Sequence, residues 1–295
     1  MLKSHTEDRH PASDGLHLRE GVAVLADLLA AQAAALAALR PALPALAGLA
    51  DRLAPLLRGG GRMGYAGAGS SGLMALSDCL ELAGTFGLSP DRTPMLFAGG
   101  AAALLHLTGD VEDDPELALA DLDRSGLASG DALLVLSASG RTPYALAVAG
   151  AARARGIRVA GFANVAGAPL LALADDAILI ETGPEVVTGS TRMGAATAQK
   201  VALNMLSVLL GIRLGHVHDG YMVNVVADNA KLTDRAARIV AAVAQVDRAA
   251  AERALSQTGG AVKPAILVAR GAAPDAAEAA LKASGGHLAA AMDGQ

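Results

Sequence analysis

Short apolar runs alternate with stretches of helical periodicity along the middle of the chain. Five runs are predicted to be strands: 62–67, 94–98, 132–137, 157–163 and 176–181. Helices are expected after most of them: 71–83, 100–108, 142–155, 168–174 and 191–212. Strands that alternate with helices indicate an α/β fold with a doubly wound, mostly parallel sheet. Ligands of such sheets bind beyond the carboxyl ends of the strands.

Residues 1–20 look irregular, and helical patterns occupy the chain on both sides of the strand region. Leucines at helical spacing over 21–57, interrupted at Pro41 and Pro44, predict two helices. After about residue 235 the strand signal stops, and alanine-rich segments at 235–254 and 275–292 predict helices. We therefore expect an N-terminal helical segment, a central α/β domain and a small C-terminal helical module: 1–57, 58–234 and 235–295.

Composition narrows the classes of function. The 295 residues are 53% hydrophobic but 2% aromatic, so the core must be built from Ala, Leu and Val. A net charge of −5 argues against a broad nucleic-acid-binding face. The lone Cys79 excludes an internal disulfide and a cysteine-based zinc cluster, and it fits the cytoplasm. We expect no signal peptide, because charged and histidine residues from Lys3 to His10 leave no apolar core there. We expect no membrane span, because charges interrupt the Ala- and Leu-rich stretch 21–57: Asp27, Arg40, Asp51 and Arg52.

The segment Leu134-Val-Leu-Ser-Ala-Ser-Gly-Arg-Thr-Pro143 predicts a strand, a tight loop and a helix N-terminus. Its loop offers three hydroxyl groups, a glycine that allows close backbone approach, and an arginine that adds charge or holds the loop: Ser137, Ser139, Thr142, Gly140 and Arg141. Hydroxyls, backbone N–H groups and a helix dipole at one spot suit a phosphate or another small anion. The alternative is a purely structural loop, which would need fewer donors.

A second loop of this kind, Gly67-Ala-Gly-Ser-Ser-Gly72, lies upstream. Its glycines fit the G-x-G-x-x-G spacing of dinucleotide-binding folds. That motif also needs an acidic residue at the end of the next strand, and Thr93-Pro-Met-Leu-Phe-Ala98 supplies none. The hydroxyls of Ser70 and Ser71 favour a compact anion instead. A glycine-rich turn without a ligand is the other alternative.

A third polar loop, Glu185-Val-Val-Thr-Gly-Ser-Thr-Arg192, precedes the long predicted helix. Ser190 or Thr191 is expected to cap that helix. Capping explains one hydroxyl, so the remaining hydroxyls and Glu185 suggest a further wall of the pocket. Gln199 and Lys200, further along, are expected at an interface or in solvent.

Two carboxylates are candidates for acid–base chemistry if the ligand is a sugar phosphate. Glu81 lies on the helix after the first loop, and Glu112 lies in an acidic stretch. From the residues alone, each is also explained as an ordinary solvated acid. His216 and His218 lie in a predicted turn without an HExxH pattern, so no metal site is expected.

Several segments together resemble the N-acetylmuramic acid 6-phosphate etherases, which belong to the sugar isomerase (SIS) group of phosphosugar-binding domains, as does the glucokinase regulatory protein. The most specific are the Gly-Pro-Glu…Gly-Ser-Thr-Arg stretch at 183–192 and Thr-Ala-Gln-Lys at 197–200. Further matches are Ser137–Pro143, Thr6–Ala12, Asn229–Arg235 and Gly260–Ile266. The resemblance covers essentially the whole chain.

The resemblance implies cleavage of the D-lactyl ether of N-acetylmuramic acid 6-phosphate to N-acetylglucosamine 6-phosphate and D-lactate. It makes Glu81, before Thr85-Phe-Gly87, and Glu112 the catalytic pair, with Glu81 as acid and Glu112 as base. No cofactor is implied. The expected partners are a phosphorylated amino sugar and a second copy of the chain, in a homodimer with its active site near the subunit boundary.

The chain also departs from the family pattern at polar positions near these motifs. An arginine, a histidine and a Lys-Ser-Gly are replaced at Leu73, at Ala101 and at Gly194-Ala195-Ala196, and an expected Asp and Lys are replaced at Asn224 and Val226. These departures keep two alternatives open. One is a phosphosugar-binding regulator without activity, and the other is a sugar-phosphate isomerase of the SIS group.

Overall fold

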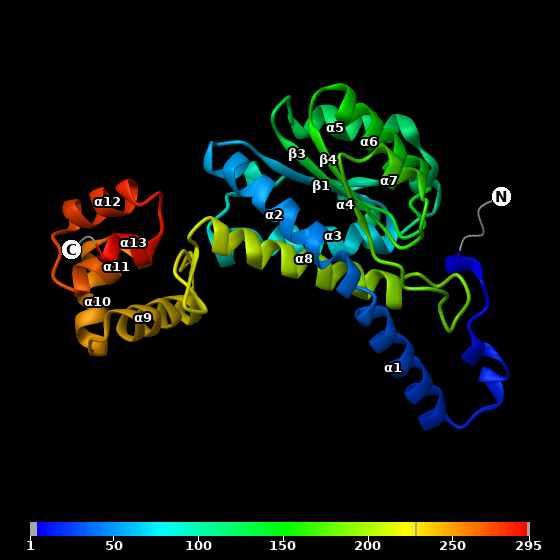
Figure 1. Cartoon of the computed structure of the whole chain (residues 1–295), viewed down its shortest axis with the longest axis horizontal. Helices are drawn as coiled ribbons and strands as arrows, with labels where there is room; N and C mark the ends of the chain where they lie inside the picture. Colours follow the sequence, from blue (N-terminus) through cyan, green and yellow to red (C-terminus); the bar gives the residue numbers. More distant parts are fainter. Residues whose placement is uncertain (1–4, 228, 294–295) are drawn as a thin grey trace. The chain divides into compact units, whose positions relative to one another are not determined.

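The computed structural model describes residues 5–227 and 229–293, and their packing forms two compact units. One unit comprises Met1–Cys79 and Asp91–Leu206, and the other comprises Leu80–Pro90 and Ser207–Gln295 (Figure 1). The three-part division expected from the sequence stays a prediction.

The five predicted strands form one sheet in the first unit. They are β1 (Met63–Gly67), β2 (Met95–Phe97), β3 (Ala132–Leu136), β4 (Arg158–Ala163) and β5 (Asp176–Leu179). All pairs are parallel, in the order β2-β1-β3-β4-β5. The expected doubly wound parallel α/β fold is therefore confirmed. From β1 the chain adds β2 on one side of the sheet, and from β3 it adds β4 and β5 on the other side. The carboxyl ends of β1 and β3 are therefore the topological switch point of the sheet.

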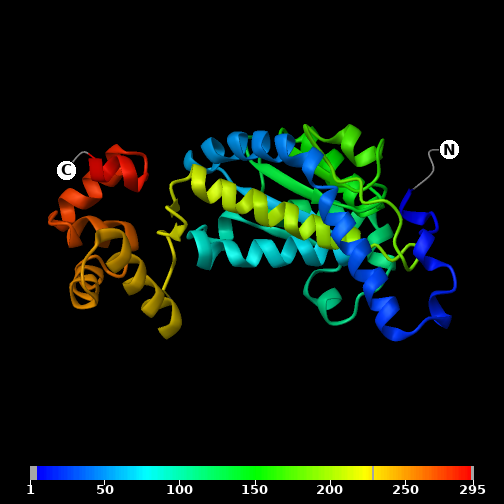
Figure 2. The ribbon, with the colours of Figure 1, turned by 60° about the horizontal axis from the view of Figure 1, so that its bottom comes forward.

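Helices cover both faces of this sheet (Figures 1 and 2). On one face lie α2 (Leu43–Arg58), α3 (Gly69–Phe86) and α8 (Gly194–Arg213); on the other lie α5 (Pro115–Ser125), α6 (Pro143–Ala154) and α7 (Pro169–Leu173). Side chains alternate along β3, so Leu133 and Val135 pack in the same apolar cluster as α6 residues Tyr144 and Val148. A sheet covered on both faces explains why the strands read as unbroken apolar runs.

Short elements complete the first unit. They are the 3-10 turns η1 (His5–Glu7), η2 (Pro11–Ser13), η3 (Leu16–Leu18), η4 (Arg40–Ala42), η5 (Pro90–Arg92) and η6 (Asp110–Asp113), with α1 (Gly21–Ala37) and α4 (Gly100–Leu105). The break between α1 and α2 falls at the two predicted prolines, which sit in the first turns of η4 and α2. Helix α5 was not predicted, because its apolar positions follow directly on the acidic stretch that reads as a loop.

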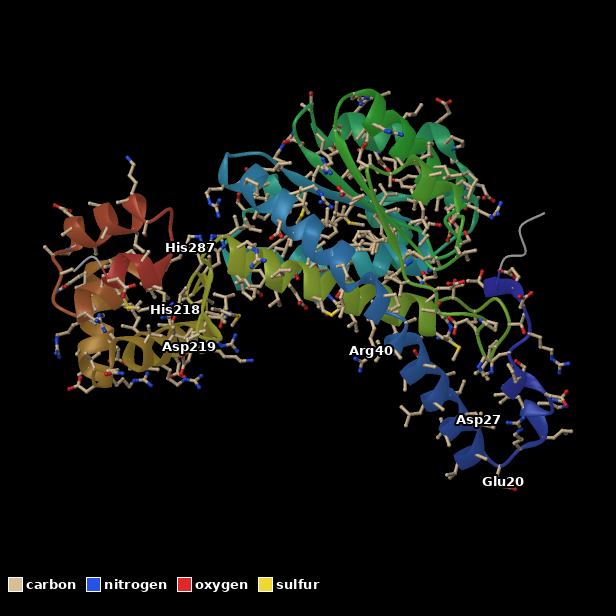
Figure 3. The ribbon with its side chains drawn as sticks, in the orientation of Figure 1. Glu20, Asp27, Arg40, His218, Asp219 and His287 are labelled. Carbon is tan, nitrogen blue, oxygen red and sulfur yellow. The ribbon has the colours of Figure 1, made fainter. Side chains whose placement is uncertain are left out.

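Helices α1 and α2 differ in how much they bury. Helix α2 buries Leu46, Leu49, Leu53 and Leu57, at the i, i+3, i+4 spacing of one helical face. Helix α1 buries only Ala35. Figure 3 labels three charged residues on and beside this otherwise apolar helix: Glu20, Asp27 and Arg40.

Two helical stretches, Gly21–Arg58 and Gly194–Arg213, are long and apolar enough to cross a membrane by length and composition alone. The expectation that no stretch resembles a membrane span was therefore wrong by this measure. The charged residues of the first stretch are so widely spaced that an 18-residue window within it contains no more than two of them. The most apolar window of the second stretch is 56% buried, as in a core helix.

The second unit contains a helical module with a core of its own. After the short hairpin of β6 (Val217–His218) and β7 (Tyr221–Met222) come five helices: α9 (Ala230–Ala244), α10 (Arg248–Gln257), α11 (Val262–Ala269), α12 (Pro274–Ala283) and α13 (Leu288–Asp293). Val240, Ile266 and Leu288 meet in its apolar cluster. The helical character expected after residue 235 is confirmed, but α11 lies between the two predicted helical segments, 235–254 and 275–292, where no helix was expected.

Candidate functional site

A cavity of about 240 Å³ lies in the first unit, lined by the loops that follow β1 and β3. The parallel register pairs Gly67 at the end of β1 with Leu136 at the end of β3, so the two loops leave the sheet side by side. The cavity therefore occupies the switch point of the sheet, where ligands of doubly wound folds bind. It is lined by Thr6, Glu7, Ala68, Ser70, Ser71, Glu112, Ala138, Ser139, Thr142, Gly189 and Thr191.

The first wall is the N-terminus of α3. Gly69 starts the helix with φ +51°, in the left-handed region that favours glycine. A Cβ on Gly72 would lie 2.7 Å from the carbonyl oxygen of Gly67, so only glycine lets this turn touch the strand. Ser70 and Ser71 stand on the first helical turn, whose N–H groups have no preceding helical carbonyl to bind. This wall presents hydroxyl and N–H donors to an anion.

The second wall is the loop between β3 and α6. Ser137 is 2% exposed, and its Oγ lies 2.9 Å from Thr142 Oγ1 and accepts a hydrogen bond from the Gly140 N–H at 3.1 Å. The Arg141 N–H donates to Ser139 Oγ at 3.2 Å. Ser137 and Gly140 thus hold the loop in shape, while Ser139 and Thr142 line the cavity.

Glu112 enters the cavity from η6. A Cβ built on Gly69 would lie 2.3 Å from Glu112 Oε1, so the carboxylate lies directly over the turn that starts α3. Burial raises the pKa of Glu112 above its usual value, and the negative charge of Asp113 raises it further. A half-buried carboxyl group with a raised pKa is a better proton acceptor once ionised, as a general base requires.

The charged side chains that line the cavity are acidic. Two of its lining residues, Glu7 and Glu112, carry carboxylates, and among the residues described none of those lining it is a lysine or arginine. A phosphate bound here would be held by hydroxyl and backbone N–H groups. Like charges repel, so the phosphate would sit away from both carboxylates.

The third wall is the loop before α8, and here the sequence-based expectation of the cap was wrong. Helix α8 begins at Gly194, which is four residues after Ser190 and three after Thr191, the two expected caps. Its first N–H groups donate instead to the carboxylate of Glu185: Gly194 to Oε2 at 3.0 Å and Ala195 to Oε1 at 2.9 Å. A carboxylate at a helix N-terminus gains from the helix dipole as well as from the hydrogen bonds.

Polar residues on α8 are buried rather than solvated. Gln199 is 0% exposed and donates from Nε2 to Asn164 Oδ1 at 2.9 Å. Asn164 in turn donates from its backbone N–H to the carbonyl of Ala138, a cavity residue, at 2.9 Å. The expectation that Gln199 lies at an interface or in solvent was therefore wrong. Lys200 keeps a side chain 23% exposed, with Nζ 3.8 Å from the carboxylate of Asp78.

The structure brings together six of the predicted site residues around the cavity: Ser70, Ser71, Glu112, Ser139, Thr142 and Thr191. Five others belong to the same loops without lining it: Ser137, Gly140, Arg141, Glu185 and Ser190. Glu81 is exposed on α3, belongs to the second unit and does not line this cavity. Binding and catalytic roles for all of these residues stay predictions.

Two lining residues, Thr6 and Glu7, were missed as site residues. They lie far from the sheet in sequence, in a stretch that carries no strand or helix pattern. The only signal was their place in a segment that resembles the etherases, Thr6–Ala12.

Two other kinds of site, a metal centre and a reactive thiol, can be compared with the described residues. No group of three or more His, Cys, Asp or Glu side chains in that part of the chain is arranged to hold a metal ion. Cys79 is buried and free, its Sγ lies 3.0 Å from the carbonyl oxygen of Thr93, and burial raises the pKa of its thiol to about 11. A protonated, buried thiol is a poor nucleophile.

Comparison with known proteins gives matches in sequence and in fold. Residues 28–164 match the SIS domain family. N-acetylmuramic acid 6-phosphate etherase of Deinococcus radiodurans is 41% identical over 96% of this chain and 93% of its own length. The etherase of Streptomyces avermitilis is 45% identical over 82% of this chain and 78% of its own length. A candidate phosphosugar isomerase from Bacteroides fragilis shares the fold, with a TM-score of 0.53 and 21% identity over 68% of this chain and 95% of its own. On this identity and coverage, the chain belongs to the N-acetylmuramic acid 6-phosphate etherase family.

Proposed function

We propose that this protein cleaves the D-lactyl ether of N-acetylmuramic acid 6-phosphate and releases N-acetylglucosamine 6-phosphate and D-lactate. The observation that carries the proposal is the near full-length similarity to an etherase, at 41% identity over 96% of the chain. The cavity at the sheet edge agrees with it, since it offers hydroxyl donors for a phosphate and a carboxylate with a raised pKa.

The proposed reaction is an elimination followed by a hydration. The sugar ring opens to an aldehyde, whose carbonyl acidifies the proton on carbon 2. Glu112 takes that proton as general base, and lactate departs from carbon 3 with a proton supplied by a second carboxyl group, that of Glu81. Water then adds to carbon 3 of the resulting enal, and the proton returned to carbon 2 completes N-acetylglucosamine 6-phosphate.

Substrate binding is assigned to the three walls. Ser70, Ser71, Ser139, Thr142 and Thr191 bind the phosphate and adjacent hydroxyl groups, with Ser137, Gly140, Arg141, Glu185 and Ser190 holding the loops that present them. A hydrogen bond to a charged phosphate contributes about 1.5–3 kcal/mol. Several such bonds together can replace the missing cationic side chain.

The proposed active protein is a cytoplasmic homodimer in which Glu81 reaches the cavity of the partner protomer. Glu81 and the neighbouring Leu80 are exposed on α3, and Glu81 does not line the cavity of its own chain. Helix α1 exposes apolar side chains, with Val22 82%, Leu25 66% and Leu29 71% exposed. Contiguous exposed apolar surface of this kind is typical of an interface.

Charges placed on α1 are expected to separate the protomers. The double variant Leu25→Lys/Leu29→Lys should run as a monomer in sedimentation analysis, because a lysine cannot be buried in an apolar contact without a partner. Glu278→Lys changes the net charge by the same amount on exposed α12 and should leave the dimer intact. A monomeric wild-type protein, or a double variant that stays dimeric, would contradict this interface.

The same proposal predicts complementation between two inactive variants. Co-expressed Glu81→Gln and Glu112→Gln chains should recover about one quarter of wild-type activity, because half of the dimers are mixed and each mixed dimer has one intact site. Recovery should be absent if both glutamates must come from one chain, and that result would overturn the sharing of the site.

D-lactate release tests the function itself. Purified protein incubated with N-acetylmuramic acid 6-phosphate should form D-lactate and N-acetylglucosamine 6-phosphate in equal amounts. Absence of D-lactate above the level of a Glu112→Gln control would defeat the etherase proposal. Binding of several hexose phosphates without turnover would then favour a regulator, and interconversion of an aldose phosphate with its ketose would favour an isomerase.

A further inference from the structure

The N-terminal segment before α1 is a built part of the cavity wall in the first unit. Thr6, in η1, is 0% exposed. Ser13 Oγ donates to the carbonyl oxygen of Val186 at 2.6 Å, which fastens η2 to the loop before α8. Arg9 pairs with Asp14 at 3.0 Å within the segment. The blue N-terminal turns and the loop before α8 lie side by side in both ribbon views (Figures 1 and 2).

Glu7 is the charged residue that this segment contributes to the lining of the cavity. Its carboxylate lies next to Gly189, where a Cβ would be 3.0 Å from Glu7 Oε2. Gly189 has φ +73° and lines the cavity together with Glu7 and Thr191. Glu7 and Glu112 therefore border the same cavity from separate elements, η1 and η6.

The chemistry of the wall decides what Glu7 can bind. A carboxylate accepts hydrogen bonds from O–H and N–H groups and repels a phosphate. Glu112 lies over the start of α3 and Glu7 beside Gly189, which leaves the loop between β3 and α6, with Ser139 and Thr142, as the wall without a carboxylate. A phosphosugar in this cavity therefore has a reason to point its phosphate to that loop and its hydroxyl or amide groups to the carboxylates.

We infer that Glu7 is a substrate-contacting residue that recognises hydroxyl or amide N–H groups of the sugar and not its phosphate. This inference rests on the proposed function for the identity of the sugar, an N-acetylated amino sugar, and on the cavity geometry for the contact. It assigns the N-terminal segment a part in ligand specificity.

The test measures binding, without turnover, by isothermal titration of the full chain with two probes. For Glu7→Ala, the affinity for N-acetylglucosamine 6-phosphate is expected to fall roughly tenfold or more, because a hydrogen bond to a charged acceptor is lost. Its affinity for inorganic phosphate should stay the same or rise, because a negative charge leaves the cavity. Glu7→Gln keeps one acceptor oxygen and should lie between wild type and Glu7→Ala.

Glu20→Ala is the matched control. Glu20 is an exposed glutamate of the same N-terminal region, lies at the far end of α1 (Figure 3) and does not line the cavity, so its two affinities should equal those of wild type. Unchanged binding of the sugar phosphate by Glu7→Ala, or an equal loss for both probes, would overturn the inference. If the Glu7 variants show the expected changes in affinity but the wild-type protein releases no D-lactate, the etherase proposal is disproved and the contact of Glu7 stands.

Discussion

Replacing Glu112 by Gln is expected to lower kcat/KM for D-lactate release by roughly 10²–10⁴-fold, the usual contribution of a positioned general base. Glutamine has nearly the same volume, so the loop over Gly69 should keep its shape. The amide oxygen cannot take a proton from carbon 2 at neutral pH. Affinity for N-acetylglucosamine 6-phosphate should therefore change far less than turnover, and an equal loss of both would argue for a structural role instead.

The pH profile gives a second view of the same residue. A general base must be ionised, so activity should be lost as pH falls through the raised pKa of Glu112, at a higher pH than for an ordinary glutamate. Asp113→Asn removes the neighbouring negative charge, lowers the pKa of Glu112 and should move this acidic limb to lower pH. The shift should be a fraction of a pH unit, because Asp113 is exposed and solvent screens its charge. An acidic limb that stays in place in Asp113→Asn would remove Glu112 from this assignment.

Local patterns were enough to predict where the cavity lies. Strand β3 and the Ser-Gly loop after it follow from one apolar run, a glycine and a proline in the first helical turn. The same reasoning located the loop that starts α3. Because parallel strands end at one edge of the sheet, two such loops predicted a shared site, and the register of Gly67 with Leu136 places them side by side.

Contacts between distant segments could not be predicted in this way. Thr6 and Glu7 reach the cavity through tertiary packing, which no period in the sequence encodes. Gln199 follows a helical pattern that is compatible with either solvent or core, and only its bond to Asn164 decides between them. The cap of α8 was misplaced for a similar reason: local rules favour a hydroxyl directly before a helix, while the chain uses a carboxylate nine residues away.

That carboxylate, Glu185, is expected to be among the most sensitive positions for stability. It is 5% exposed and accepts hydrogen bonds from the N–H groups of Gly194 and Ala195, the first two residues of α8. Each hydrogen bond to a charged group contributes about 1.5–3 kcal/mol, and their loss leaves two donors buried without an acceptor. Glu185→Ala should therefore lower the free energy of unfolding by about 3–5 kcal/mol.

Urea denaturation followed by circular dichroism measures this loss, with two variants to locate its cause. Glu181→Ala removes an exposed carboxylate from the same loop and should change stability by no more than about 0.5 kcal/mol. Glu185→Gln should fall between the two, because its amide keeps one acceptor oxygen but turns an NH₂ group toward the second N–H donor. A Glu185→Ala protein as stable as Glu181→Ala would mean that water satisfies the start of α8. A Glu185→Gln variant that loses stability but keeps its affinity for N-acetylglucosamine 6-phosphate would separate the cap from ligand binding and leave Gly189 and Thr191 as the parts of this loop that line the cavity.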